Sequence, residues 1–267
     1  MASYKTIAIL AIIGLLPSTA YAKQARDFCA DRPGLGTPAC TVAPGRAMVE
    51  VGIGDWTLDR QSGSRIDTIA VAQLVTRFGL GDHLEAQIGW NGYSHVRTRD
   101  TIGTIVTAMG VGDVRIALRR NLLNPDGSGT SLAIMPYASI PVRRSAISAG
   151  DWSAGVTAPI SFSLSRSIGI AFTPDIDAAV NQSGNGRHLA FGSVAGVSCS
   201  FAKSVTLTSE LSWFRDNDPA GRSSKVLSGL SLAWQPSKTL QFDVGTNIGI
   251  AGSAPNQEVY FGIARRF

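Results

Sequence analysis

The chain has 267 residues, a formal net charge of +5 at pH 7, and a hydrophobic share of 44%. Its basic residues occur singly or in short pairs, such as Arg119-Arg120 and Arg265-Arg266, and they form no long basic block. Nucleic-acid binding requires a basic face together with a recognisable binding motif. The sequence shows neither feature, so we expect no nucleic-acid partner.

Residues 1–22 predict a cleaved secretory signal peptide. The short basic start MASYK precedes the apolar run TIAILAIIGLLP, and the stretch ends in the small-x-small pattern Ala20-Tyr21-Ala22. A membrane anchor is disfavoured because a spanning helix needs ~20 apolar residues. The pattern is typical of an exported protein.

Residues 23–45 predict a separate N-terminal periplasmic segment with little periodicity. The segment contains Pro33, Pro38 and Pro44, together with Cys29 and Cys40. In an oxidising compartment, a disulfide between these two cysteines is the expected state. No histidine or further cysteine lies nearby to complete a metal site, so we expect no metal. The segment either plugs the domain that follows or tethers it, and the sequence leaves both readings open.

Period-two alternation dominates the chain from residue 46 onward. In LQFDVGTNIGI (240–250), apolar residues fall on one face, and Gln241, Asp243 and Asn247 fall on the other. This pattern is typical of strands. About twelve segments show it, with lengths near the ~9–11 residues of a tilted membrane strand. The expected strands are 46–58, 66–78, 83–95, 110–122, 130–141, 151–163, 167–178, 187–200, 204–215, 224–235, 239–250 and 257–267.

Short turns and longer links alternate between these segments. GLGD (79–82) and NPDGSG (124–129) are compact, whereas VRTRDTIGTIVTAM (96–109) and NQSGNGR (181–187) are longer or more polar. Membrane barrels have short periplasmic turns and longer outer loops. The alternation therefore places both ends of the barrel domain on the periplasmic side.

Four features favour a membrane barrel over a soluble sandwich. The inner face is rich in small and polar residues, the number of strands is even, and the signal peptide exports the chain. Aromatic residues such as Trp90, Trp213 and Trp234 lie toward strand ends, where interfacial aromatics belong. Closure of a barrel pairs every backbone group within the protein, as lipid requires. The sequence thus predicts an all-β fold, a transmembrane antiparallel β-barrel of about 12 strands over residues 46–267, in the outer membrane.

The chain ends in EVYFGIARRF, a strand pattern that runs to the last residue. Its alternating apolar or aromatic positions resemble the C-terminal signal by which outer-membrane barrels are recognised for assembly. This resemblance implies the barrel-assembly machinery and outer-membrane lipid as partners. The residues that match the signal are Val259, Phe261, Ile263 and Phe267.

Three stretches of the chain resemble a known outer-membrane family. They are DRPGLGTPACTVAPGRAMVEVGI (31–53), TRFGLGDHLEAQIGW (76–90) and GVGDVRIALRRNLL (110–123). Each is similar to a segment of the family described as "Putative MetA-pathway of phenol degradation". The resemblance covers most of residues 23–267. It implies an outer-membrane barrel with a transporter-like role for small solutes, aromatic ones among them.

The charged residues of the inner face are the candidate functional residues. They could select solutes by charge and hydrogen bonding, or they could pair with one another and brace a filled barrel. The favoured function is a channel or transporter-like barrel for a small-molecule solute. The alternative is a structural or adhesive barrel with a plugged lumen. The candidates are Glu85, Asp113, Arg115, Glu210 and Asp243.

An outer-membrane hydrolase is the third hypothesis, and it requires a nucleophile, a histidine and an orienting group. The three histidines, His83, His95 and His188, follow no Gly-x-Ser-x-Gly elbow. Each is better interpreted as a polar surface or lumen residue. GLGDHL and GVGDV complete no dinucleotide fingerprint. We therefore expect no catalytic residues, no enzyme activity and no cofactor.

Overall fold

The computed structural model describes residues 26–61, 63–142 and 145–267. The regular secondary structure in these ranges consists of β-strands. The predicted signal peptide, residues 1–22, lies outside the described residues. Within the described ranges, no helix has the length and apolar character needed to cross a membrane. The strands are β1 (Ala47–Asp59), β2 (Arg65–Gly81), β3 (Leu84–Arg99), β4 (Ile105–Val111), β5 (Val114–Leu123), β6 (Thr130–Ile140), β7 (Ser153–Thr157), β8 (Ile160–Ser163), β9 (Ile168–Val180), β10 (Arg187–Ala202), β11 (Val205–Asp216), β12 (Ser223–Ser237), β13 (Leu240–Gly252) and β14 (Gln257–Arg266).

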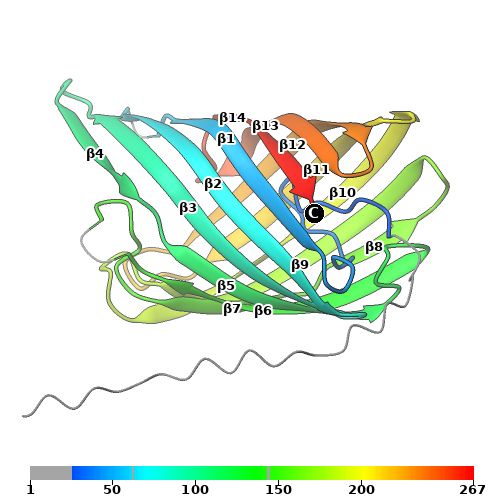
Figure 1. Ribbon diagram of the computed structural model, residues 1–267. Coiled ribbons are helices and arrows are strands. Elements are labelled where there is room, and N and C mark those ends of the chain that lie inside the picture. The colour runs from blue at the N-terminus through cyan, green and yellow to red at the C-terminus, as the bar shows by residue number, and fades with distance from the viewer. Residues whose placement is uncertain (1–25, 62, 143–144) are drawn as a thin grey trace, which may run out of the picture.

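The strands form one closed antiparallel sheet, because β1 pairs with both β2 and β14 (Figure 1). Two of the barrel strands are interrupted. β4 and β5 both pair with β3, and β7 and β8 both pair with β6 and β9. Fourteen segments therefore make twelve barrel strands. The predicted all-β, antiparallel barrel of about 12 strands is confirmed, and each expected strand falls on one observed strand or one interrupted pair.

The region expected to be a long link, 96–109, is instead a hairpin. β3 continues to Arg99, β4 begins at Ile105, and the Asp100 carboxylate accepts N–H groups from Ile102 at 3.0 Å and Thr104 at 2.7 Å. A short Asx-type turn therefore replaces the expected loop. β4 pairs with β3 and, within the described residues, with no other strand.

The two faces of the barrel invert the polarity of a soluble core. Large apolar side chains face outward, including Ile88 at 51% and Phe261 at 49% exposure. The largest fully buried side chains include Arg77, Glu85 and Arg119 on the inside. An apolar outer band around a polar interior is the pattern of outer-membrane barrels.

The twelve strands define two ends of the barrel. The short-turn end holds the five compact turns and both termini of the barrel domain, where the Phe267 N–H donates to the Ala47 carbonyl at 2.8 Å. The long-loop end holds the links after β1, β3, β6, β9, β11 and β13. These two names locate the functional residues below.

Candidate functional site

Residues 26–46, here called the N-terminal plug, lie inside the short-turn half of the barrel (Figure 1). The N–H groups of Asp31 and Arg32 donate to the Glu50 carboxylate on β1, at 3.0 and 2.8 Å. Further along the plug, the N–H groups of Leu35 and Gly36 donate to a carboxylate on β11, at 2.7 and 2.9 Å. The plug therefore bridges strands that are well separated around the barrel wall.

The β11 carboxylate belongs to Glu210, and glycines let the plug backbone reach it. Gly34 has φ +120°, a conformation that side chains rarely adopt. A Cβ at Gly34 would lie 2.5 Å from a Glu210 oxygen, and one at Gly36 would lie 3.0 Å from the other oxygen. The two glycines of the sequence PGLG are thus required sterically, because a larger side chain would not fit between the plug backbone and the carboxylate.

An ion-pair network of buried wall residues and the partly exposed Asp31 fixes the plug to the wall formed by β1, β2, β3 and β5. The Arg77 guanidinium lies 2.8 Å from Glu85, 3.1 Å from Glu50 and 2.9 Å from Asp31 of the plug. Arg119 lies 2.8 Å from the same Asp31 carboxylate. Both guanidinium groups also donate to the Cys40 carbonyl. Such charges are stable in a buried site only when each has a close partner.

The predicted lumen residues Asp243 and Glu85 also form hydrogen bonds with the plug. Asp243 on β13 accepts a charge-assisted hydrogen bond from Arg32 at 2.8 Å, and Gln241 donates to the Arg32 carbonyl at 2.7 Å. Glu85 accepts the Val42 N–H at 2.6 Å. The backbone and the side chains of the plug are therefore both bound by the barrel.

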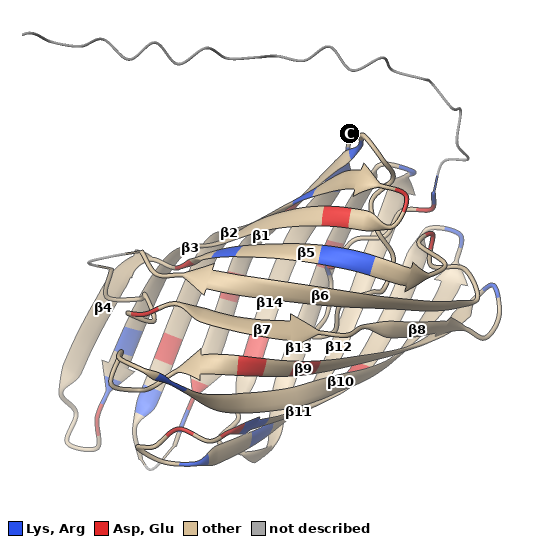
Figure 2. Ribbon diagram, turned by 90° about the horizontal axis from the view of Figure 1, so that it is seen from below, with Lys and Arg blue, Asp and Glu red and all other residues tan. Residues whose placement is uncertain are grey.

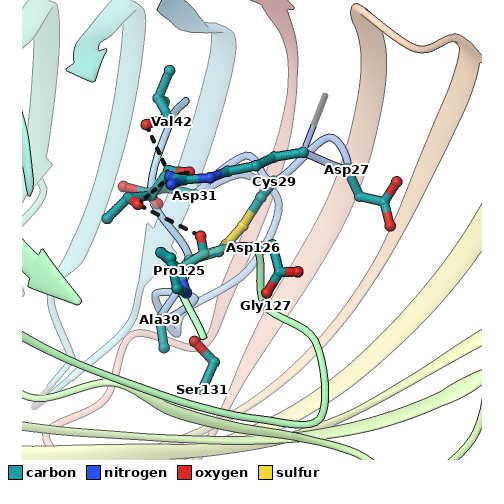
Figure 3. Close-up of a disulfide and its surroundings, with 12 residues drawn as sticks. Asp27, Cys29, Asp31, Ala39, Val42, Pro125, Asp126, Gly127 and Ser131 are labelled. Carbon is teal, nitrogen blue, oxygen red and sulfur yellow. Dashed lines mark hydrogen bonds between the residues drawn. A yellow bond between two sulfur atoms is a disulfide. The ribbon is translucent and has the colours of Figure 1, made fainter. Parts of the chain in front are cut away.

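Cys29 and Cys40 form a disulfide within the plug, and the β5–β6 turn packs against it (Figure 3). The Thr41 N–H donates to the Pro125 carbonyl of that turn at 2.9 Å. A Cβ at Gly127 would lie 3.4 Å from the Cys40 Cβ. The carbonyls of both cysteines accept hydrogen bonds from the Arg77 guanidinium, at 2.8 Å for Cys29 and 3.5 Å for Cys40, so the disulfide joins two parts of the plug that meet at the same network.

Asp113, between β4 and β5, anchors the link 141–152 at the long-loop end. Its two carboxylate oxygens accept N–H groups from Val142 at 3.1 Å and Ala149 at 3.0 Å. The carboxylate is buried, and these bonds hold the link beside the lumen. Asp113 therefore binds two backbone N–H groups of a segment that follows β6, the strand after its own β4–β5 pair.

Arg115 lies in the lumen with its charge over an aromatic ring. Its guanidinium carbon is 3.5 Å from the centroid of Tyr137, and the Tyr137 hydroxyl donates to Asp175 at 3.1 Å. Thr157 also donates to Asp175, at 2.7 Å. Figure 2 shows basic segments on β5 and an acidic segment on β9, with β6 and β7 between the two strands.

A polar cavity of about 500 Å³ occupies the long-loop half of the lumen. Its wall comes from β1, β2, β3 and β14, together with the Asp113 region and the anchored link. The lining residues are Asp55, Thr57, Thr68, Ala70, Gln73, Asn91, Ser94, Gly112, Asp113, Ile147, Ala149 and Glu258. The lumen thus has two parts, a plugged short-turn half and a polar cavity beyond it.

The histidines do not come together in one site. His83 lies in the β2–β3 turn at the short-turn end, whereas His188 is the second residue of β10, at the opposite end. The His188 ring lies 2.7 Å from Asp216 and 3.5 Å from Asp218, and the Ala220 and Gln182 N–H groups lower the pKa of Asp218. Donor atoms of these three side chains lie within 4.8 Å of one another, a spacing that would also accommodate a divalent cation.

The five predicted lumen residues make three kinds of contact. Glu85, Glu210 and Asp243 contact the plug, Asp113 contacts the link 141–152, and Arg115 contacts an aromatic ring. Sequence reasoning missed Glu50, Arg77, Arg119 and the plug residue Asp31. Glu50, Arg77 and Arg119 lie on strands, and the period-two alternation could have identified them, because it places them on the same inner face as the predicted lumen residues.

Three residues of the predicted assembly signal, Val259, Phe261 and Ile263, lie on β14, and Phe267 directly follows that strand. Val259, Phe261 and Phe267 are 37%, 49% and 56% exposed on the outer surface. Arg265 is also exposed, with its guanidinium carbon 5.3 Å from the Phe267 ring centroid. Their recognition by assembly machinery stays a prediction.

The fold and the polar lumen define an outer-membrane β-barrel. The chain belongs to the family described as "Putative MetA-pathway of phenol degradation", whose model matches residues 30–267. No curated protein matches the sequence.

Solved structures of outer-membrane proteins share the fold. An outer membrane channel from Pseudomonas putida F1 is 13% identical, with a TM-score of 0.65, over 88% of this chain and 100% of that one. The NanC porin is 9% identical, with a TM-score of 0.52, over 82% of this chain and 98% of that one. The predicted family, fold and outer-membrane location are therefore confirmed.

Proposed function

We propose that the protein is an outer-membrane channel for small solutes, aromatic compounds among them, and that solutes enter through the polar cavity. The observation that carries the proposal is the cavity of about 500 Å³ within a closed barrel of this family. Its volume falls in the range of small-ligand sites, which is ~300–1,000 Å³. The family description and the channel of similar fold support this reading.

We further propose that the predicted lumen residues divide into anchors and selectivity residues. Glu85, Glu210 and Asp243 act as anchors of the plug, and Asp113 sets the position of the link 141–152. Arg115 is exposed to the lumen and has no salt bridge within the described residues. Replacing Asp113 with Asn and Arg115 with Gln should therefore change conductance or ion selectivity.

The N-terminal plug favours a second candidate, a structural or adhesive barrel whose lumen stays closed. Its network contacts occupy the short-turn half of the lumen. In a channel, the plug must leave a passage beside it or move. In a structural barrel, the plug stays fixed and no current flows.

The deciding experiment is single-channel recording of the refolded chain 23–267 in a planar bilayer, with phenols or aromatic acids added. A channel gives discrete open steps that one of these solutes blocks. A refolded, heat-modifiable barrel that never conducts would overturn the channel and support the plugged barrel. We propose no enzymatic role. Ester or lipid turnover lost on replacement of His83, His95 and His188 would contradict that.

A further inference from the structure

Two carboxylates of the cavity lie next to each other on the seam between the first and last strands. In the β1–β14 ladder, Asp55 is opposite Tyr260, and Thr57 is opposite Glu258. Asp55 and Glu258 are therefore diagonal neighbours across the ladder, and both line the cavity. Their placement depends on a break in register between Gly52 and Gly54, which turns Asp55 toward the lumen.

No described basic residue neutralises this pair through a salt bridge. Asp55 accepts the Thr57 hydroxyl at 3.3 Å, and Glu258 accepts the Asn247 amide at 2.7 Å. Arg32 is the basic residue that faces this region from the plug, and it is bound to Asp243. Two adjacent carboxylates repel each other unless a proton or another cation lies between them.

The rest of the cavity wall adds hydrogen-bonding groups without adding positive charge. Thr68, Gln73, Asn91 and Ser94 supply neutral donors and acceptors, and Asp113 supplies a third carboxylate. A lumen lined by one sign of charge concentrates counter-ions and repels ions of its own sign. The wall therefore accepts ammonium groups and hydroxyl donors, and it disfavours carboxylate solutes.

We propose that Asp55 and Glu258 form a cation-binding subsite that makes the channel prefer protonated aromatic amines and neutral hydroxylated aromatics over aromatic carboxylates. This inference rests on the proposed channel function and specifies its substrate class. The subsite is local to the cavity, so its ligand preference can be measured with or without a current.

Two measurements on the refolded chain 23–267 test the subsite. Calorimetric titration compares three probes of similar size, namely benzylammonium, benzyl alcohol and benzoate. Reversal potentials in a potassium chloride gradient give the cation-to-anion permeability ratio. The variants are Asp55→Asn, Glu258→Gln and the double replacement. Asp27→Asn serves as the matched control, because Asp27 is an exposed carboxylate that does not line the cavity.

We expect benzylammonium to bind more tightly than benzoate. The double variant should weaken benzylammonium binding about tenfold and lower the permeability ratio about threefold to tenfold, as the loss of nearby charge predicts. Asp27→Asn should change neither. A conducting protein that is anion-selective, or whose selectivity the double variant leaves unchanged, overturns the subsite while the channel stands.

The two proposals fail in different ways. Charge-dependent benzylammonium binding by a protein that never conducts would retain the subsite and overturn the channel. Absence of both conduction and charge-dependent binding overturns both. Heat-modifiability checks that each variant folds. If the double variant does not fold, each single replacement must still lower benzylammonium affinity for the subsite to stand.

Discussion

Replacement of Arg77 by Met is the most direct perturbation of the plug. Arg77 is fully buried and lies within 3.1 Å of Asp31, Glu50 and Glu85. Removing it leaves three carboxylates with Arg119 as the remaining buried cation. Breaking a buried ion pair by removing one partner costs about 3–5 kcal/mol. The plug-bound state should therefore be disfavoured by about 10²- to 10⁴-fold.

The assay combines single-channel recording with the temperature of the heat-modifiability transition in detergent. Arg77→Met should raise the open probability or conductance and lower the transition temperature. Adding Glu50→Gln and Glu85→Gln to this variant should restore part of the transition temperature, because the stranded charges are then removed. Arg166→Ala removes an exposed arginine in the β8–β9 turn and should have no effect. Wild-type conductance and transition temperature in Arg77→Met would refute the reasoning.

Three further predictions concern other contacts. Gly34→Ala should release the plug from its β11 carboxylate, because the added Cβ would meet that carboxylate at 2.5 Å, and protease cleavage within the plug should increase. Replacing Cys29 and Cys40 with Ser should lower the free energy of unfolding by up to about 3 kcal/mol, measured by denaturant titration, since the disulfide closes a short loop. Backbone N–H groups hold the pKa of Asp218 below its ordinary value, so its contact with Gln182 should persist at moderately acidic pH. That contact should be lost as the pH falls through the folded-state pKa, with lower amide protection factors in the link 181–186, calculated against the intrinsic exchange rate at each pH.

Each of these predictions has a control and a contrary outcome. Gly221 has open space around its Cβ position, so Gly221→Ala should leave the plug unchanged. Equal plug cleavage in both glycine variants would contradict the steric argument. The disulfide argument fails if reduction leaves the denaturant midpoint unchanged. For the acid-dependent contact, Asp218→Asn should remove the pH dependence of these protection factors in the link, and an unchanged profile would rule out Asp218.

Alternation in the sequence was enough to predict the barrel because each strand separates lipid from lumen. The same alternation put Glu85, Glu210 and Asp243 on the inner face. It could not identify their partner, because the plug has no periodicity and its contacts are largely backbone N–H groups. Because almost every residue type carries a backbone N–H group, the amino-acid sequence does not show which of these groups will bind a carboxylate.

Local irregularities set the second limit of sequence reasoning. Strict alternation from Glu50 would turn Asp55 away from the lumen, but the register shift between Gly52 and Gly54 reverses the faces. The positive φ of Ala72 marks a comparable irregularity in β2, where Gln73 and Ala70 both line the cavity. The cavity therefore arises from departures from the pattern that predicts the strands.

The position of Arg32 links closure of the barrel to insertion of its own leading segment. Its N–H binds Glu50 on β1, and its guanidinium binds Asp243 on β13, so one residue connects both sides of the strand that closes the ring. The plug thus connects β1 and β13, the two strands on either side of the last strand, β14. A barrel that closed with this segment outside would lack these contacts at the β13–β14–β1 junction, so we expect insertion of the segment to precede or accompany closure of the ring.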